Sequence, residues 1–299
     1  MDLDKDFLIK NEYVRKKTNA VYDPEFTKAL KRVPWSEWFS QPNPLRCRQE
    51  YLERYHEWIL ASELNKIEGL ETFSVRHLTN GTTQSFDEFY FKYANRRLRI
   101  FLGEYAYHAR VFTNWKHLEL EPLSDQDIVI ISAPFCTTGD VHPKMKEVLD
   151  EAYNKSVPVL VDCAYFGTCI DFNLDVSHPA IESVNFSLTK GTGLGDIRSG
   201  IRYSNEENDL PIAQQNRFDH TILGAAKIGL YMMDNFSVDY IPKKYREIQL
   251  EVCKRADIQP TKCMHLALGD DRWQDFCIEG DYKRLGIREL IKAKRKGLI

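Results

Sequence analysis

The sequence has 299 residues, of which 43% are hydrophobic and 28% are charged, and its formal net charge is −3. These values are ordinary for a globular chain that is long enough for one large core and a smaller appended subdomain. They exclude a strongly positive field for nucleic acid, and no apolar run approaches the roughly 20 residues that a membrane-spanning helix needs. We therefore expect no nucleic-acid partner and no membrane span.

The N-terminal Met-Asp-Leu-Asp-Lys-Asp has neither the basic start nor the apolar stretch of a secretory signal, and it is too acidic for a usual transit peptide. The seven cysteines are odd in number and form no close Cys-x-x-Cys pair, so we expect reduced thiols and propose no metal site. The sequence predicts a cytoplasmic protein.

The first half of the chain alternates between helical and extended patterns. Residues 1–43 carry prolines among aromatic and charged residues, which indicates an irregular arm with short elements. Apolar residues then recur every three or four positions from Leu45 to about Ile67, which predicts an amphipathic helix. A strand over 73–78 and a helix over 82–94 follow, joined by a short turn.

Later segments continue this alternation. Apolar runs at 128–133, 157–162 and 183–188 predict strands, 143–154 predicts a helix, 199–204 a further strand, and 211–236 one long helix. Apolar strands between helices are typical of a parallel sheet covered on both faces. Residues 283–296 are basic and favour a solvated helix rather than a nucleic-acid contact.

The predicted fold class is therefore α/β, with a mostly parallel central sheet sandwiched by helices. We expect three segments: residues 1–68 form an N-terminal arm and helix that join a small subdomain, 69–236 form the large domain, and 237–299 form a reduced C-terminal subdomain.

Several polar residues follow the predicted strands. Lys190 lies just after one apolar strand, Asp162 ends another, and Tyr165 follows three residues later. Such strand ends open toward the ligand crevice of a parallel-sheet protein. Taken singly, a lysine is usually a solvated surface residue and an acid at a strand end is as often a helix N-cap.

The turn Asn80-Gly81-Thr82-Thr83 stands between a strand and a helix. Its backbone N–H groups and the helix dipole favour an anion such as phosphate, and the two threonine hydroxyls can add donors. Alone, the turn is better explained as a plain helix cap.

These parts together resemble a known family. Ser187-Leu-Thr-Lys190-Gly-Thr-Gly-Leu-Gly-Asp-Ile-Arg198-Ser-Gly is similar to the Ser-x-Ser-Lys block, with its trailing Gly-x-Arg-x-Gly, of fold-type-I pyridoxal-phosphate enzymes, specifically the class I/II aminotransferases. The order of phosphate turn, aromatic residue, Asp-x-x-Tyr, lysine and arginine agrees as well. The resemblance covers about Phe73 to Ser204 and implies pyridoxal 5'-phosphate as cofactor.

The resemblance also implies roles for individual residues. Lys190 would carry the cofactor as a Schiff base, Asp162 would pair with the pyridine nitrogen, and Tyr165 would bond the ring oxygen. The phosphate would be held by Gly81, Thr82, Thr83, Ser187 and Arg198, and a tyrosine would stack on the ring, either Tyr105 or, as the alternate, Tyr107. The implied protein is a homodimeric aminotransferase that moves an amino group from an amino acid or amine to a keto acid in a ping-pong cycle.

Two departures from the family stand out. Cys136 occupies the position of an asparagine that touches the ring oxygen, and a thiol donates only weakly. The C-terminal region is short for a subdomain that normally supplies an arginine for the substrate carboxylate. Arg272, Arg284 and Arg288 are the candidates, and the sequence does not choose among them.

Other functions remain open at this point. The run Gly191-Thr-Gly193-Leu-Gly195 invites a nucleotide-binding interpretation, but a strand pattern rather than a helix follows it. A lyase or decarboxylase would use the same cofactor residues, and a non-catalytic protein could keep the fold only to bind a ligand.

Overall fold

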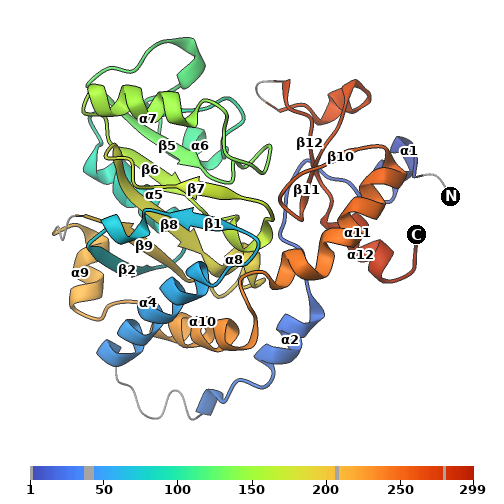
Figure 1. The fold of residues 1–299 in the computed structure, drawn as a ribbon, viewed down its shortest axis with the longest axis horizontal. Coiled ribbons are helices and arrows are strands. Elements are labelled where there is room, and N and C mark those ends of the chain that lie inside the picture. The colour runs from blue at the N-terminus through green and yellow to red at the C-terminus, as the bar shows by residue number, and fades with distance from the viewer. Residues whose placement is uncertain (1–2, 37–43, 206–208, 279–280) are drawn as a thin grey trace.

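The computed structural model describes residues 3–36, 44–205, 209–278 and 281–299, and its centre is a seven-stranded sheet (Figure 1). The strand order is β2-β9-β8-β6-β5-β3-β4. All neighbouring pairs are parallel except those that β9 makes with β2 and β8. The strands are β2 (Val75–Thr79), β3 (Arg97–Ile100), β4 (Trp115–His117), β5 (Asp127–Ser132), β6 (Val159–Asp162), β8 (Ile181–Ser187) and β9 (Gly200–Ser204).

Both faces of this sheet are buried, as its apolar strands require. Ile128 and Ile130 of β5 pack in one cluster with Phe86 and Phe89 of α5 (Thr82–Lys92), whereas Val129 and Ile131 pack in the main core on the other side. Because successive side chains of a strand point to opposite faces, one apolar strand supplies both clusters. The predicted α/β class with a mostly parallel central sheet is confirmed.

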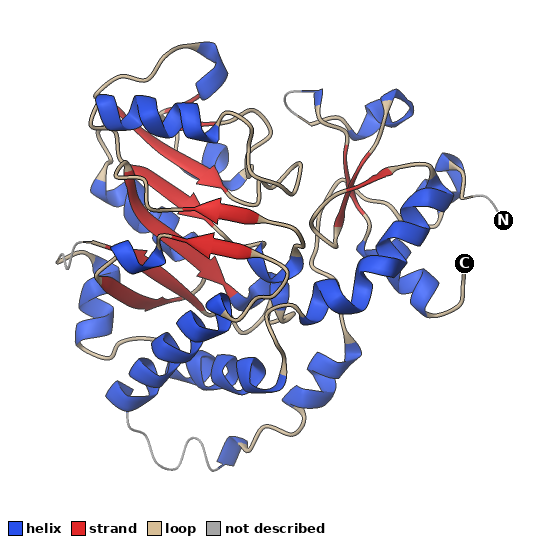
Figure 2. Ribbon diagram, viewed as in Figure 1, coloured by secondary structure: helices blue, strands red, loops and turns tan. Residues whose placement is uncertain are grey.

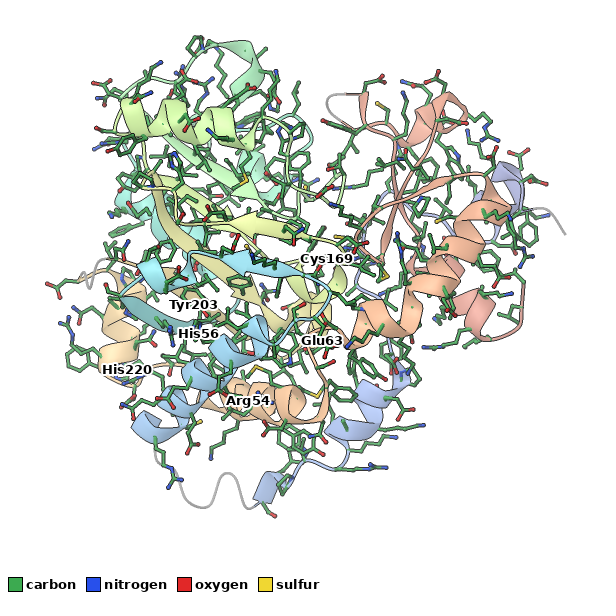
Figure 3. All side chains as sticks on the ribbon, viewed as in Figure 1. Arg54, His56, Glu63, Cys169, Tyr203 and His220 are labelled. Carbon is green, nitrogen blue, oxygen red and sulfur yellow. The ribbon has the colours of Figure 1, made fainter. Side chains whose placement is uncertain are left out.

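Helices α4 (Pro44–Leu60) and α10 (Leu223–Asn235) pack against each other on the main-core side (Figures 1 and 2). His56 of α4 lies beside Tyr203 of β9, and its Nδ1 is 3.1 Å from the tyrosine hydroxyl (Figure 3). α6 (Tyr107–Val111), α7 (Met145–Asn154), α8 (Leu188–Gly191) and α9 (Pro211–Arg217) complete the helices around the sheet, with the 3-10 turns η1 (Leu70–Thr72), η2 (Leu118–Leu120) and η3 (Phe166–Thr168) between elements.

A second group of elements stands beside the sheet. It contains α11 (Tyr240–Ala256), the antiparallel strands β10 (Gln259–Pro260), β11 (Leu266–Leu268) and β12 (Arg284–Gly286), the 3-10 turn η4 (Asp271–Phe276) and α12 (Arg288–Arg295). Helix α1 (Lys5–Lys10) joins this group through Lys5, whose Nζ donates to the Arg272 carbonyl at 2.6 Å, and α2 (Pro24–Leu30) follows along the N-terminal arm.

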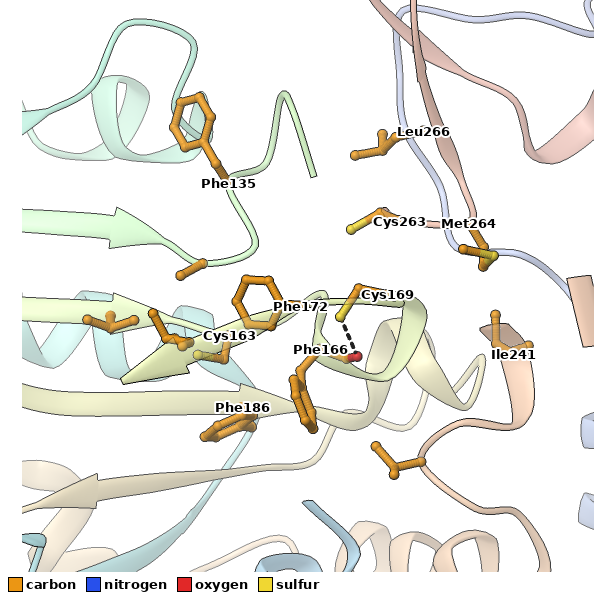
Figure 4. Close-up of a cluster of buried hydrophobic side chains, with 14 of the residues drawn as sticks. Phe135, Cys163, Phe166, Cys169, Phe172, Phe186, Ile241, Cys263, Met264 and Leu266 are labelled. Atoms are coloured by element: carbon orange, nitrogen blue, oxygen red, sulfur yellow. Dashed lines mark hydrogen bonds between the residues drawn. The ribbon is translucent and has the colours of Figure 1, made fainter. Parts of the chain in front are cut away.

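The two groups share one apolar core (Figure 4). The backbones of Cys169, at the end of the η3 segment, and Cys263 form an isolated antiparallel β-bridge. Next to it, Met264 N–H donates to the Thr168 carbonyl at 2.9 Å. Arg15 of the N-terminal arm forms a second bridge, with Gly286. Division of the chain at residues 68 and 236 stays a prediction.

Three predicted elements were wrong in extent. The helix predicted to Ile67 ends at Leu60, because Asp239 accepts from Ser62 and Glu63 and the chain then enters β1 (Lys66–Glu68), which pairs with β7 (Asn173–Asp175). The single helix over 211–236 is two helices, since Asp219 adopts a positive φ of 55° between α9 and α10.

The third is the basic segment 283–296, which begins as strand β12 and becomes helical only at Arg288, because Arg284 to Gly286 pair with β11. No described helix is long and apolar enough to cross a membrane.

Candidate active site

The polar residues singled out in the sequence meet at one edge of the central sheet. Ser132, Asp162 and Ser187 end the parallel strands β5, β6 and β8, and Ser132 pairs in register with Asp162. The carboxyl ends of parallel strands form the usual ligand crevice of such sheets.

Asp162 is a buried carboxyl with few partners. It is 6% exposed, and its Oδ1 accepts from the Ala164 N–H at 2.9 Å. Burial raises its pKa to about 7, and the nearby Glu104 adds to this effect. A group in this state takes up or gives back a proton near neutral pH.

Lys190 lies in α8, directly after β8. Ser187 caps this short helix by accepting from Thr189 N–H at 3.3 Å. The Lys190 ammonium is 3.5 Å from the Thr18 carbonyl and 5.6 Å from the centre of the Tyr165 ring. Burial lowers its pKa to about 8, against the opposing charge of Asp162, so a part of the amine is neutral near pH 7.

Tyr165 follows β6 and shares this space with Lys190. Its hydroxyl is 3.4 Å from Thr18 Oγ1, and burial raises its pKa, so the phenol is a neutral donor. Thr18 belongs to the N-terminal arm, which therefore reaches the sheet edge from a distant part of the sequence.

A candidate anion cradle lies at the N-terminus of α5. Gly81 has a φ of +83°, and a Cβ there would stand 3.0 Å from both Arg198 Nη2 and Ser187 Oγ. Arg198 donates from Nε to the Asn80 carbonyl at 3.1 Å and from Nη2 to Thr83 Oγ1 at 2.7 Å. The guanidinium, two hydroxyls and the uncapped helix end thus surround a space that a side chain would fill.

Tyr105 lies near Asp162, whose charge, after burial, helps to raise the pKa of the phenol. Its ring is 43% exposed and stacks on the Tyr107 ring at 5.9 Å. Tyr107 is held by its hydroxyl, which donates to Asp87 at 2.7 Å. Of the two tyrosines, Tyr105 is therefore the more exposed.

Cys136 is buried in the turn after β5. Its thiol donates to the Gly103 carbonyl at 3.3 Å, and burial raises its pKa, so it is a neutral thiol rather than a thiolate. Arg284 Nη1 lies 3.3 Å from the Cys136 carbonyl, which brings β12 to the same site.

The three arginine candidates now differ clearly. Arg284 reaches the site, whereas Arg272 is occupied at the surface by Asp270 and Asp257, and Arg288 pairs with Glu289.

Sequence reasoning missed three residues of this site: Thr18, Glu104 and His265. Glu104 Oε2 accepts from Ser132 N–H at 2.9 Å, and burial raises the pKa of this carboxyl. His265 packs on Tyr165 with ring centres 4.6 Å apart. Only Glu104 had a signal in the sequence, its position next to Tyr105.

Comparison with known proteins gives a consistent fold. No protein-family profile matches the sequence, and no curated protein sequence matches it significantly. Among solved structures, the aromatic aminotransferase from Pyrococcus horikoshii OT3 is 14% identical with a TM-score of 0.65, and 95% of each chain is covered.

Two further structures agree. A putative aminotransferase from Clostridium difficile 630, solved with pyridoxal phosphate bound, is 12% identical with a TM-score of 0.64, covering 92% of this chain and 88% of that one. L-threonine-O-3-phosphate decarboxylase from Porphyromonas gingivalis is 12% identical with a TM-score of 0.60, covering 95% of this chain and 98% of that one. The protein therefore has the fold of the fold-type-I pyridoxal-phosphate enzymes, as the resemblance of its lysine block implied.

Proposed function

We propose that the protein is a pyridoxal-phosphate-dependent aminotransferase that moves an amino group between an amino acid or amine and a keto acid. The observation that carries this proposal is Lys190, whose amine lies 5.6 Å from the centre of the Tyr165 ring and has a pKa lowered to about 8 by burial, with the charges of Asp162 and Arg198 nearby. A structural lysine needs neither a lowered pKa nor these neighbours.

The residues present fit the cofactor. Its phosphate matches the cradle of Gly81, Ser187 and Arg198, because a guanidinium and an open helix end both favour an anion. Thr82 and Thr83 stand at the same helix end. Tyr105 offers an exposed ring for stacking. Asp162 offers a carboxylate for the ring nitrogen, and Tyr165 a phenol for the ring oxygen.

When bound, pyridoxal phosphate supplies an aldehyde that condenses with amines and a ring that withdraws electrons from the bond being broken. Lys190 would act twice, first as the amine that holds the cofactor and then, once displaced by the substrate amine, as the base that moves a proton on the substrate α-carbon. At pH 7, about a tenth of a group with a pKa of about 8 is neutral, and that fraction is the reactive one.

Asp162 would keep the ring nitrogen protonated. In the chain as described its carboxyl holds a proton until about pH 7, because burial disfavours its charge. A cationic partner would reverse that preference and make the ionised form stable. Because Cys136 donates weakly, Tyr165 would carry most of the hydrogen bonding to the ring oxygen.

Arg284 would bind the substrate carboxylate. It comes from β12, in the group of elements that stands beside the sheet, and its guanidinium already reaches the Cys136 carbonyl. Arginine suits this task because it offers two parallel N–H donors to one carboxylate.

A lyase or decarboxylase is the alternative, and the decarboxylase from Porphyromonas gingivalis shares the fold. A non-catalytic ligand-binding protein is a second alternative.

We also propose a homodimer. Exposed Phe218 and Ile222, in the segment between α9 and α10, offer apolar surface for it. Light scattering that shows a stable monomer would contradict the dimer.

The deciding experiment is an absorption spectrum of the purified protein with pyridoxal phosphate, before and after a panel of amino acids and amines, with Lys190→Ala as the control. Loss of the visible band on adding one donor, and its return on adding a keto acid, would support transamination. Loss without return would favour a lyase. A wild-type spectrum identical to that of Lys190→Ala would support the ligand-binding alternative.

A further inference from the structure

Two cysteines face each other where the second group of elements meets the central sheet. The backbones of Cys169, after η3, and Cys263, before β11, form the isolated antiparallel bridge. The residue after each cysteine donates its N–H to the carbonyl of the residue before the other cysteine, at 3.0 Å and 2.9 Å. Because these two bonds flank the pair, Cys169 and Cys263 occupy a non-hydrogen-bonded position of the bridge.

This position brings two side chains as close together as an antiparallel pair allows. Residues opposite each other at a non-hydrogen-bonded position have Cα atoms about 4.5 Å apart and side chains on the same face. A disulfide needs Cα atoms roughly 4.4–6.8 Å apart. Figure 4 shows the two side chains as neighbours in the shared core. Joining the two sulfurs therefore needs rotation of the side chains rather than movement of the backbone.

Both cysteines are neutral thiols in the structure. Cys169 Sγ donates to the Phe166 carbonyl at 3.0 Å, and Cys263 Sγ donates to the Gly139 carbonyl at 3.6 Å. Both side chains are fully buried, and burial raises the pKa of each thiol, to about 12 for Cys263. After burial, the charge of Cys263 is the next cause that raises the pKa of Cys169, which agrees with two neighbouring sulfurs.

We propose that Cys169 and Cys263 form a redox-sensitive site that a low-molecular-weight disulfide converts to a cross-strand disulfide. One cysteine thiolate attacks a sulfur of the reagent, forms a mixed disulfide and releases one small thiol. The other thiolate attacks the protein sulfur of this mixed disulfide and releases the second small thiol. The two cysteines are oxidised, the reagent is reduced, and the two cysteine protons pass to the released thiols. Because buried thiols are inert, the first attack takes place when the bridge opens.

The disulfide ties the second group of elements to the sheet beside the candidate active site. Cys169 follows Tyr165 by four residues, and Cys263 shortly precedes His265, whose ring packs on Tyr165 with ring centres 4.6 Å apart. The two cysteines are far apart in the sequence, and a link that closes a long loop restricts the unfolded chain. The oxidised protein is therefore the more resistant to unfolding.

The test treats the full chain with hydroxyethyl disulfide in the presence of 2-mercaptoethanol. One sample is native, and a second is refolded from urea in the same redox buffer, which gives the reagent access to every cysteine. Peptide mapping by mass spectrometry without reducing agent identifies the linked cysteines. Cys169→Ser and Cys263→Ser each remove one partner. Cys253→Ser is the matched control, because Cys253 is equally buried but lies within helix α11, and Cys163→Ser removes another thiol near Cys169.

We expect the peptide that joins Cys169 to Cys263 to be the main linked product in the wild type, Cys253→Ser and Cys163→Ser, and to be absent from Cys169→Ser and Cys263→Ser. The intact mass should fall by the two hydrogens lost and return with dithiothreitol. By circular dichroism, the oxidised wild type should unfold at a higher urea concentration than the reduced wild type, whereas treatment of Cys263→Ser should leave its unfolding midpoint unchanged.

Absence of this link from either wild-type sample would overturn the proposal, and so would a main link between Cys163 and Cys169. A link that leaves the urea midpoint of the wild type unchanged would overturn it as well. The wild-type samples alone decide these outcomes, so they hold even where a serine in the core disturbs folding. Because no measurement uses the cofactor or the activity, the outcome is independent of the proposed function.

Discussion

Replacement of Asp162 by asparagine should stabilise the cofactor-free protein and inactivate the loaded one. Asparagine has nearly the same shape and can still accept from the Ala164 N–H, but it carries no charge to bury. The folded carboxyl has a pKa of about 7, raised by burial from an ordinary value of 3.8. A difference of about three pH units corresponds to about 4 kcal/mol.

The direction in which the wild-type stability changes with pH follows from proton binding. Between about pH 4 and pH 7 the folded state holds a proton on Asp162 that the unfolded state has lost, so wild-type stability falls as pH rises through this window. Asp162→Asn removes that dependence. The variant should therefore gain up to about 4 kcal/mol over the wild type at pH 8 and almost nothing near pH 4.

Urea unfolding of the cofactor-free wild type and variant at pH 4.5, 6 and 8, each read by circular dichroism, measures this difference. Asn185, the buried in-register neighbour of Asp162 on β8, provides the control through Asn185→Ser, whose effect should not vary with pH. A constant difference between Asp162→Asn and wild type across the three pH values would refute the reasoning, because it would mean that the carboxyl has an ordinary pKa in the fold.

Three further predictions follow from the same geometry. Gly81→Ala should weaken binding of the cofactor at least tenfold, because the new Cβ would lie 3.0 Å from Arg198 and Ser187 and because Gly81 has a φ of +83°. An unchanged dissociation constant of the cofactor, measured by fluorescence titration, would exclude the cradle. Arg198→Ala should lower cofactor affinity by about tenfold or more, whereas Arg217→Ala, which removes an exposed partner of Asp209, should not. The rate of cofactor capture should rise about tenfold per pH unit and level off above about pH 8, as the Lys190 amine becomes neutral; stopped-flow absorbance that still climbs well above pH 9 would contradict a lowered pKa.

The parts of the site that the sequence predicted are those carried by contiguous segments. The turn at Gly81, the pair Asp162 and Tyr165, and the block from Ser187 to Arg198 each follow a strand, and the order of strands in an α/β protein brings their ends together. The parts it missed depend on contacts between distant segments. Thr18, which the sequence missed, meets Tyr165 across 147 residues, and the contact that distinguishes Arg284 from the other two arginine candidates, with Cys136, spans 148.

The same distinction explains the errors in secondary structure. The apolar pattern over 211–236 is compatible with one helix, and the break depends on the backbone of Asp219, which adopts a positive φ that the pattern does not reveal. Strand β12 is three residues long and exists through its pairing with β11, so a basic segment with helical composition concealed it.

The two buried carboxyls at the sheet edge show which residue is prepared for a ligand. Glu104 is satisfied by the protein itself, since it accepts from Ser132 N–H at 2.9 Å, from the Ser132 hydroxyl and from Tyr105 N–H at 2.8 Å. Asp162 has the Ala164 N–H and the Thr82 hydroxyl, and its pKa is raised to about 7. Burial raises the pKa of both carboxyls, but Glu104 has three donors from the protein whereas Asp162 has two, so under the proposed function Asp162 would gain a compensating cationic partner when the cofactor binds. The stability that Asp162 costs the empty protein should therefore be regained in the complex, so the cofactor should raise the unfolding temperature of the wild type more than that of Asp162→Asn.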